Sequence, residues 1–230
     1  MTDLNFESFK QRVFKCEKCS RLTKFRKLIS QKKRKSYLKQ KYWGKPIVGY
    51  GKLNAQILFV GLAPAAHGAT RTGRVFTGDK SADFLFKCLH KANLCNHPYS
   101  LNKEDGLILY NTYITTALKC VPPEDKPTAK ELNNCFSIFD QELMFLKNKK
   151  VLIALGKVAF DACIKYFINY YNLKTKYKFK HDAIFKIGNF YLVGCYHPSP
   201  RNVNTKRINQ PKMVRLFLKA QKLMKHSLSK

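Results

Sequence analysis

Four short apolar runs that alternate with helical segments constrain the fold of this chain most strongly. The runs are residues 57–60, 113–117, 151–155 and 191–195. Each run has the length of a buried strand, and the segments between them carry apolar residues at helical spacing. Strands that alternate with helices favour a parallel sheet. We therefore predict an α/β fold in which a parallel sheet is sandwiched between helical layers.

The length of the chain, 230 residues, suits one ordinary α/β domain or two very small ones. Hydrophobic residues make up 45% of the chain, which is enough to form a large core. We predict a single domain over residues 1–230, with an N-terminal helical segment over about residues 1–45.

The charge of the chain is strongly positive. Lysine and arginine total 44 against 14 aspartates and glutamates, a formal net charge of +30. A polyanionic partner accounts for such an excess, because each phosphate that the protein neutralises releases a condensed counterion. A lysine-rich bias of the source proteome is the alternative explanation. The charge therefore favours a nucleic acid as partner but identifies no reaction.

The chain shows no sign of membrane insertion or secretion. It lacks an apolar stretch of about 18 residues, and residues 1–5, MTDLN, do not resemble a signal peptide. We expect an intracellular, cytoplasmic protein associated with the nucleoid. Its eight cysteines should then stay reduced, which makes metal binding the better explanation for a clustered pair.

Four of the cysteines form a candidate metal site. Cys16 and Cys19 form a CxxC pair, and Cys120 and Cys135 flank a proline-rich loop and the start of a helix. Four thiolates suit either a tetrahedral Zn²⁺ ion or a [4Fe–4S] cluster. The alternative is four scattered buried cysteines, since free cysteine is often buried.

Two loops composed mostly of small or polar residues directly follow predicted strands. The first is GLAPAAHG at residues 61–68, with RTGRVFTGD downstream at residues 71–79. The second is HPSPRN at residues 197–202. Small residues let a ligand approach the main chain, whose N–H groups then act as donors. Ligands of such sheets bind at the carboxyl ends of the strands, so we place the site there.

These stretches closely resemble the uracil-DNA glycosylase superfamily and, within it, family 5, the type B enzymes. The resemblance rests on GLAPAAHG, RTGRVFTGD, HPSPRNVNT at residues 197–205, YWGKP at residues 42–46 and the four cysteines. It implies a three-layer α/β/α sandwich around a four-stranded parallel sheet. It also implies a [4Fe–4S] cluster, held by Cys16, Cys19, Cys120 and Cys135, that ties on the N-terminal segment.

The resemblance implies hydrolysis of the N-glycosidic bond of uracil in DNA, which starts base-excision repair. The enzyme would flip the nucleotide into a pocket. We expect Phe76 to stack on the flipped base and His197 to donate to uracil O2, where negative charge collects. Asp79 is expected to orient or deprotonate the attacking water. The structural alternatives are a core phenylalanine, a histidine that caps a loop and an aspartate that caps a helix.

The remaining base pocket is expected to consist of Gly61, Leu62, Ala63, Pro64 and Thr116. Relatives in other families carry an aspartate or asparagine at the position of Ala63, whereas an alanine is expected in family 5. Family members usually carry an asparagine at the position of Thr116, where it reads the uracil edge. Threonine offers a single hydroxyl there. We therefore predict relaxed selectivity or weaker activity, with hypoxanthine as a further substrate.

The partner is expected to be double-stranded DNA with U·G mispairs, and single-stranded DNA is a second candidate. Phosphate contacts should be largely independent of sequence and sensitive to salt. The residues expected to bind DNA are Arg71, Arg74, Ser199, Arg201, Asn202 and Lys206, together with Lys80 and Arg207.

We expect a monomer. Two alternatives to the glycosylase remain open. The first is a non-catalytic iron–sulfur protein that binds nucleic acid on the same fold, and the second is a zinc-binding module unrelated to repair.

Overall fold

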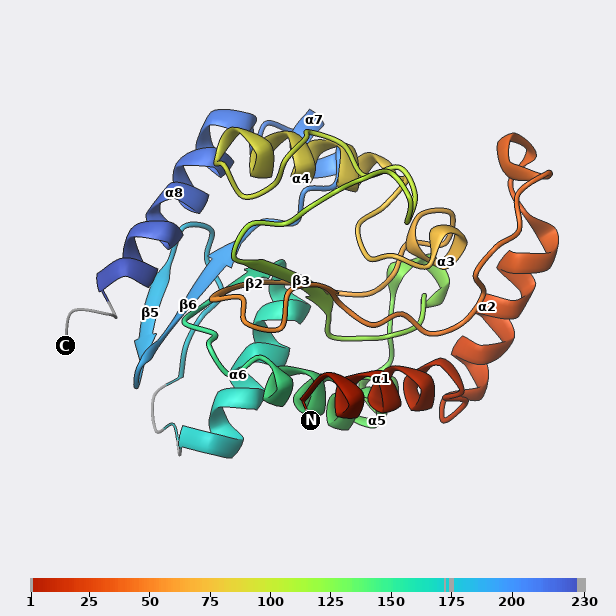
Figure 1. Ribbon diagram of the computed structural model, residues 1–230, viewed down its shortest axis with the longest axis horizontal. Helices are drawn as coiled ribbons and strands as arrows, with labels where there is room; N and C mark the ends of the chain where they lie inside the picture. Colours follow the sequence, from red (N-terminus) through yellow and green to blue (C-terminus); the bar gives the residue numbers. More distant parts are fainter. Residues whose placement is uncertain (1, 172, 174–175, 227–230) are drawn as a thin grey trace.

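A mixed six-stranded sheet forms the centre of the molecule in the computed structural model, which describes residues 2–171, 173 and 176–226 (Figure 1). The strand order is β1-β3-β2-β4-β6-β5. The strands are β1 (Tyr50–Gly51), β2 (Ile57–Gly61), β3 (Thr112–Thr116), β4 (Val151–Leu155), β5 (Ile184–Ile187) and β6 (Phe190–Cys195). The central four, β3, β2, β4 and β6, are parallel.

The two edge strands differ from the prediction. β1 pairs antiparallel with β3, and β5 pairs antiparallel with β6, so these two strands add to the four parallel strands that were predicted, and the sheet has six strands rather than four. β1 spans two residues, and β5 alternates exposed and less exposed side chains. Neither strand contains the continuous apolar run that marks a strand buried on both faces. The predicted fold class, an α/β sandwich, is confirmed.

Alternate side chains of the central strands face two separate hydrophobic clusters. In β2, Ile57 and Phe59 belong to one cluster, and Leu58 and Val60 belong to the other. This alternation is the two-residue period of a strand. Helices α4 (Lys80–Lys91) and α8 (Gln210–His226) pack on the first face, and α5 (Ala129–Phe145) and α6 (Lys157–Tyr171) pack on the second (Figure 1).

The N-terminal segment contributes α1 (Thr2–Phe14) and α2 (Ser20–Lys32). Helix α1 lies against α5, where the rings of Phe6 and Phe9 contact Phe145 at centroid distances of 5.2 and 5.3 Å. Helix α2 stands at the side of the sandwich and, with the loop after it, projects from the body (Figure 1). In the part of the chain that the structure describes, no helix is both long and apolar enough to span a membrane.

The carboxyl ends of the four parallel strands lie in register at one edge of the sheet. Gly61 pairs with Thr116, and Leu155 pairs with Cys195. The chain leaves β2 for β3 on one side and later enters β4 on the other, so the strand order reverses beside β2. Such a switch point opens a crevice outside the strand ends. The short elements α3 (Ala69–Thr72), α7 (Pro200–Asn204), η1 (Lys35–Tyr37) and η2 (Pro123–Asp125) lie in the loops.

Candidate active site

A cavity of about 350 Å³ lies at the carboxyl ends of the parallel strands. Both loops singled out in the sequence contribute to it, as does the segment that follows the third cysteine. The lining residues are Leu62, Ala63, Ala65, Phe76, Asp79, Ser81, Asp125, His197, Ser199 and Pro200. The structure therefore brings Phe76, Asp79 and His197 together around one cavity.

Phe76 is held in a conformation that few side chains adopt. Its φ is +46°, in the left-handed region, and its side chain is buried. A Cβ on Gly61 would lie 2.8 Å from the Phe76 ring, so only glycine leaves room for the ring there. The ring centroid of Phe76 lies 5.9 Å from that of His197, with 33° between the planes. Backbone strain of this kind persists where the surrounding structure holds it, often at functional sites.

His197 follows β6 and is fixed through the backbone of its own loop. The Asn202 side chain donates to the His197 carbonyl oxygen across 2.9 Å. Ser199 caps α7 by accepting from the Asn202 N–H at 3.4 Å. Burial lowers the pKa of His197 to about 4, because the charged imidazolium would lose its hydration. The imidazole is therefore neutral at pH 7 and carries one N–H donor.

Asp79 caps a helix through one of its two carboxylate oxygens. It is the N-cap of α4, and its Oδ1 accepts from the N–H groups of Ser81 and Ala82, both at 3.0 Å. Among the described residues, Oδ2 has no hydrogen-bond partner. A Cβ on Gly68 would lie 2.1 Å from Oδ2, so the glycine gives this oxygen its space. Burial raises the pKa of Asp79 against the opposing effect of the two N–H bonds.

Three residues of the expected base pocket lie outside the cavity lining: Gly61, Pro64 and Thr116. Thr116 is buried, and its hydroxyl donates to the Leu118 carbonyl oxygen across 2.9 Å. That bond holds the turn after β3. A direct contact between Thr116 and a base stays an untested prediction.

Two arginines of the expected DNA surface are engaged inside the protein. Arg74 is buried and forms a bidentate ion pair with Asp105, at 2.6 and 2.9 Å, and also donates to Thr77. The Arg71 guanidinium donates to the carbonyl oxygens of His67 and Gly78. Both side chains brace the loop that carries Phe76 and Asp79. Contact of either with phosphate is untested.

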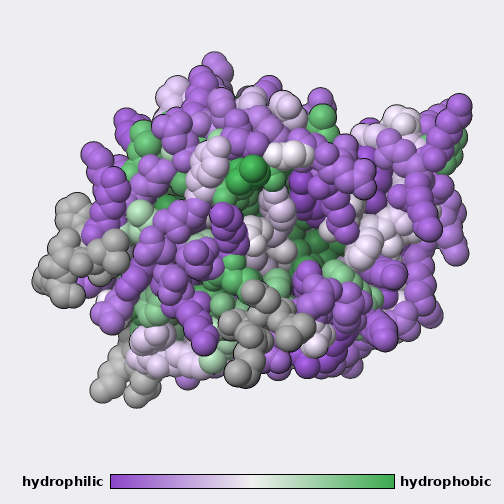
Figure 2. All heavy atoms as spheres, viewed as in Figure 1, coloured by the Kyte–Doolittle hydropathy of each residue, from purple (hydrophilic) through white to green (hydrophobic). Residues whose placement is uncertain are grey.

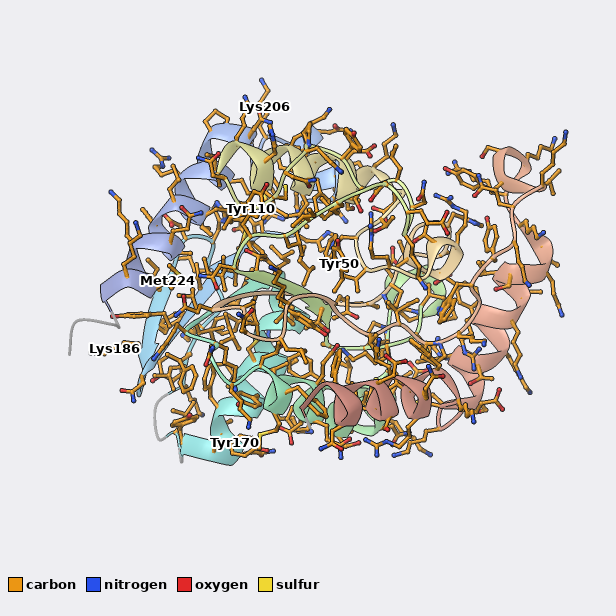
Figure 3. All side chains as sticks on the ribbon, in the orientation of Figure 1. Tyr50, Tyr110, Tyr170, Lys186, Lys206 and Met224 are labelled. Carbon is orange, nitrogen blue, oxygen red and sulfur yellow. The ribbon has the colours of Figure 1, made fainter. Side chains whose placement is uncertain are left out.

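The other expected DNA-binding residues follow, in the chain, residues that line the cavity. Arg201, Lys206 and Lys80 are exposed, and Ser199 lines the cavity itself. The Lys206 side chain points outward, away from the body (Figure 3). The guanidinium of Arg207 lies 4.9 Å from the ring centroid of Tyr196, the residue before His197. These positions suit contact with a backbone that passes the cavity mouth.

The four predicted cluster cysteines surround a second, small cavity. Cys16, Cys19, Cys120 and Cys135 all line it. Burial raises the pKa of the Cys120 thiol to about 12 and that of Cys135 to about 11. Within the described residues, no group of three or more His, Cys, Asp or Glu side chains is arranged to hold a single metal ion. The structure thus brings the four cysteines together but leaves the nature of any bound group untested.

Sequence reasoning missed four lining residues: Ala65, Ser81, Asp125 and Pro200. Ala65 and Pro200 belong to the two recognised loops, and Ser81 follows the N-cap Asp79. Asp125 lies in a different segment, between Cys120 and α5. A signal was present, because this acid stands in a proline-rich loop after a parallel strand, in a chain with few acids.

Comparison with known proteins gives one consistent result. The family model described as Uracil DNA glycosylase superfamily matches residues 48–222. A type-5 uracil-DNA glycosylase from Pyrobaculum aerophilum is 40% identical over 94% of this chain and 92% of its own length. One from Thermus thermophilus is 38% identical over 94% and 97%. One from Mycobacterium bovis is 37% identical over 90% and 78%.

Proposed function

The chain belongs to the uracil DNA glycosylase superfamily and, within it, to the type-5 enzymes, and from that premise we propose that it removes uracil from DNA. It hydrolyses the N-glycosidic bond of a flipped nucleotide and thereby starts base-excision repair. One observation carries the proposal: a cavity of about 350 Å³ in which Phe76, Asp79 and His197 meet. Its size lies at the small end of ligand pockets, as a single base requires.

Base recognition begins with the ring of Phe76, which forms part of the cavity wall. The base enters the cavity and stacks on the Phe76 ring, which Gly61 leaves room for. Flipping costs a few kcal/mol of stacking and pairing energy, and least for a mispaired base. Duplex DNA with a U·G mispair is therefore the expected substrate, and single-stranded DNA is a second one.

Bond cleavage leaves negative charge on the departing uracil. His197 donates its N–H to uracil O2, where this charge collects. A neutral donor suits the role, since burial keeps the pKa of His197 near 4. A donor that is already positioned stabilises the developing anion without reorganisation during the reaction.

Asp79 positions and activates the attacking water. Its Oδ1 is occupied by the α4 N-cap bonds, which fix the carboxylate, and the residue itself lines the cavity. Ala63 stands where other families place a polar side chain for this water. Asp79 therefore orients the water through Oδ2 and accepts its proton.

We also propose that the four cysteines hold a [4Fe–4S] cluster. The donor set is right, since clusters of this type take four thiolates. Sulfurs around one Zn²⁺ lie about 2.3 Å from the ion, whereas a cluster of four irons and four sulfides needs a wider arrangement. The support from the structure is that all four cysteines line one small cavity. Bound there, the cluster would tie α2 to the segment between β3 and α5.

The cluster is tested on the purified protein. We expect a brown protein with broad visible absorbance and close to four iron atoms per chain. Cys16→Ser and Cys120→Ser should lose iron and colour. Cys88→Ala is the matched control, because Cys88 lies on α4 with its side chain in the hydrophobic core and does not line the small cavity. A colourless protein that contains zinc would contradict the proposal.

Base selectivity is proposed to be relaxed, with hypoxanthine as a further substrate. The support is Thr116, whose single hydroxyl is already bonded to the Leu118 carbonyl. No amide at this position reads the uracil edge. Thr116→Asn should raise the ratio of uracil removal to hypoxanthine removal. Strict restriction of the natural protein to uracil would contradict this reading.

The function is tested with a labelled duplex that carries one U·G pair. Incubation followed by alkali should cut the strand at the uracil, and a C·G duplex should stay intact. The alternative, a non-catalytic iron–sulfur protein that binds nucleic acid, predicts intact strands with the cluster-loaded protein. That outcome would overturn the proposed function.

A further inference from the structure

A second carboxylate, Asp125, lines the same cavity as Phe76, Asp79 and His197. It belongs to η2, in the loop that joins β3 and the cysteine segment to α5. Nothing in the mechanism described above uses it. A carboxylate in a pocket for a flipped nucleotide has direct consequences for the reaction.

The loop fixes where Asp125 stands. Pro122, Pro123 and Pro127 restrict the backbone on both sides of it. Glu124 and Asp125 have φ values of +54° and +56°, two successive residues in the left-handed region. Two such residues in succession are unusual, because side chains other than glycine rarely adopt this region. A loop that holds two such residues while aiming an acid at the cavity is a candidate functional element.

The charge of Asp125 is uncompensated within the described residues. Its carboxylate has no ion pair and no hydrogen bond there, whereas Glu124 pairs with Lys126 at 3.0 Å. DNA that places a nucleotide in the cavity brings phosphates near its mouth. A bare carboxylate at that place repels them and weakens binding. Its benefit must therefore appear at another step of the reaction.

The exposure of Asp125 indicates the step of the reaction at which its charge acts. The residue is exposed, so it stands at the rim of the cavity, while Phe76 is buried in its wall. A flipped nucleotide inserts its base and leaves its deoxyribose at the mouth. As the C1′–N bond breaks, its electrons leave with the base and the sugar becomes positively charged, as in glycoside hydrolysis. We propose that Asp125 stabilises this cationic deoxyribose, while Asp79 handles the water.

This inference rests on the proposed function and makes its own predictions. A carboxylate that stabilises only the cation should accelerate cleavage and weaken binding of the intact DNA. A carboxylate that reads an N–H of the base should instead change the ranking of substrates. A purely structural role for the loop should move binding and cleavage in the same direction.

The chain offers a matched pair of variants. Asp125→Asn removes the charge and keeps a residue type that tolerates the left-handed region. Glu124→Gln removes an equal charge one residue away, from a side chain that does not line the cavity. Both variants therefore change the net charge by the same amount, and only the first changes the cavity.

The kinetic test is single-turnover release of uracil from a U·G duplex. Asp125→Asn should lower the maximal rate constant by at least about tenfold while binding the duplex as tightly as wild type or more tightly. Glu124→Gln should leave the rate constant within about twofold. Equal rate constants for the two variants would overturn the inference and leave the proposed function intact. Wild-type protein that releases no uracil would overturn the function, and the inference with it.

A binding test separates cation stabilisation from other roles. Two duplexes carry an abasic analogue at the target position, one with a cationic pyrrolidine ring and one with a neutral tetrahydrofuran ring. Wild type should prefer the cationic analogue, and Asp125→Asn should lose about tenfold of that preference. Glu124→Gln should keep it. An unchanged preference in Asp125→Asn, or a changed ranking of uracil and hypoxanthine without loss of preference, would overturn the inference.

Discussion

The chemistry of the site depends on two glycines that make room for two functional side chains. Gly61 admits the Phe76 ring, and Gly68 admits Oδ2 of Asp79, with no space for a Cβ at either place. The small-residue loop after β2 therefore contributes to the site through the side chains that its glycines lack. It lets an aromatic ring and a carboxylate approach the main chain at the end of the sheet.

The two roles of Asp79 can be separated by mutation. Asp79→Asn keeps an N-cap acceptor for α4 but removes the charge, so stability should stay within about 0.5 kcal/mol while cleavage falls at least about 100-fold. Asp79→Ala should lose both, with a stability cost of about 1 kcal/mol. Chemical denaturation and single-turnover cleavage measure the two effects. Full activity in Asp79→Asn would show that the residue is only a cap.

The stability of the protein should also depend on pH through His197. Its pKa is about 4 in the folded protein and 6.5 as the reference value, so between these pH values the unfolded chain binds more protons. Stability is then present above pH 6.5 and is lost as the pH falls towards 4. In His197→Asn, the free energy of unfolding should fall by about 2 kcal/mol less over this pH range than in wild type. This difference is smaller than the whole pKa shift would give, because the ring faces the open cavity and solvent screens its charge.

The comparison of wild type with the variant isolates His197. Burial also lowers the pKa of His67 and His181, and both of these contributions persist in the variant. Urea denaturation at pH 7 and pH 4.5 gives the four stabilities required. Identical pH dependence in the two proteins would contradict the lowered pKa of His197 in the folded protein.

Single residues also show where sequence reasoning stops. Phe76, Asp79 and His197 were predictable because motif and chemistry point to the same side chains. Arg74 was expected on DNA, because its buried partner Asp105 lies 31 residues away in the chain and only folding brings the two together. Asp125 was missed for the same reason, since its cavity exists only after the loops converge.

The elements around the site are joined by a buried polar network. Glu142 of α5 is fully buried and accepts from the ammonium of Lys119, the hydroxyls of Tyr113 and Thr115, and the N–H of Gly49. Lys119 also donates to the Thr116 carbonyl oxygen across 2.6 Å. The network ties β3, the segment beside Cys120 and α5 together beneath the site.

Breaking this network should be costly. Glu142→Gln leaves the Lys119 ammonium buried without a counter-charge, so we expect a loss of about 3 kcal/mol in the free energy of unfolding. Glu142→Leu combined with Lys119→Met should cost less than the single change, because no charge stays buried. Urea denaturation of the three proteins checks the order. A change below about 1 kcal/mol in Glu142→Gln would contradict the account.

At the same scale, the central strands were predictable and the edges were not. The runs at β2 and β4 are buried throughout, so their apolar character appears directly in the sequence. Edge strands carry mixed patterns, because one side of their backbone is unpaired and their faces are less covered. β1 and β5 are extended because they pair with β3 and β6, which their own sequences do not reveal.

The whole molecule is a basic body with one cavity at the strand ends that gathers the expected catalytic groups. Hydrophilic side chains cover most of the face shown in Figure 2, including the projecting part around α2. With a net charge of +30, the protein should bind DNA with strong salt dependence and little sequence preference.

The salt dependence distinguishes surface cations from internal ones. Lys206→Ala should reduce the slope of log affinity against log salt by about 0.9, as expected for one lost phosphate contact. Arg74→Ala should instead destabilise the fold by about 3 kcal/mol, since it leaves Asp105 unpaired. Binding titrations from about 50 to about 200 mM salt and urea denaturation measure the two effects. A slope unchanged by Lys206→Ala would remove this residue from the interface.

The central claim is that one extruded uracil occupies the cavity between Phe76 and His197. A crystal structure of the protein with a duplex that carries 2′-fluoro-2′-deoxyuridine opposite guanine tests it most directly, because the fluorine slows cleavage and preserves the substrate. We expect a uracil ring stacked on Phe76, with O2 within hydrogen-bond distance of His197. A uracil that stays stacked in the duplex, or that lies in another part of the protein, would contradict it.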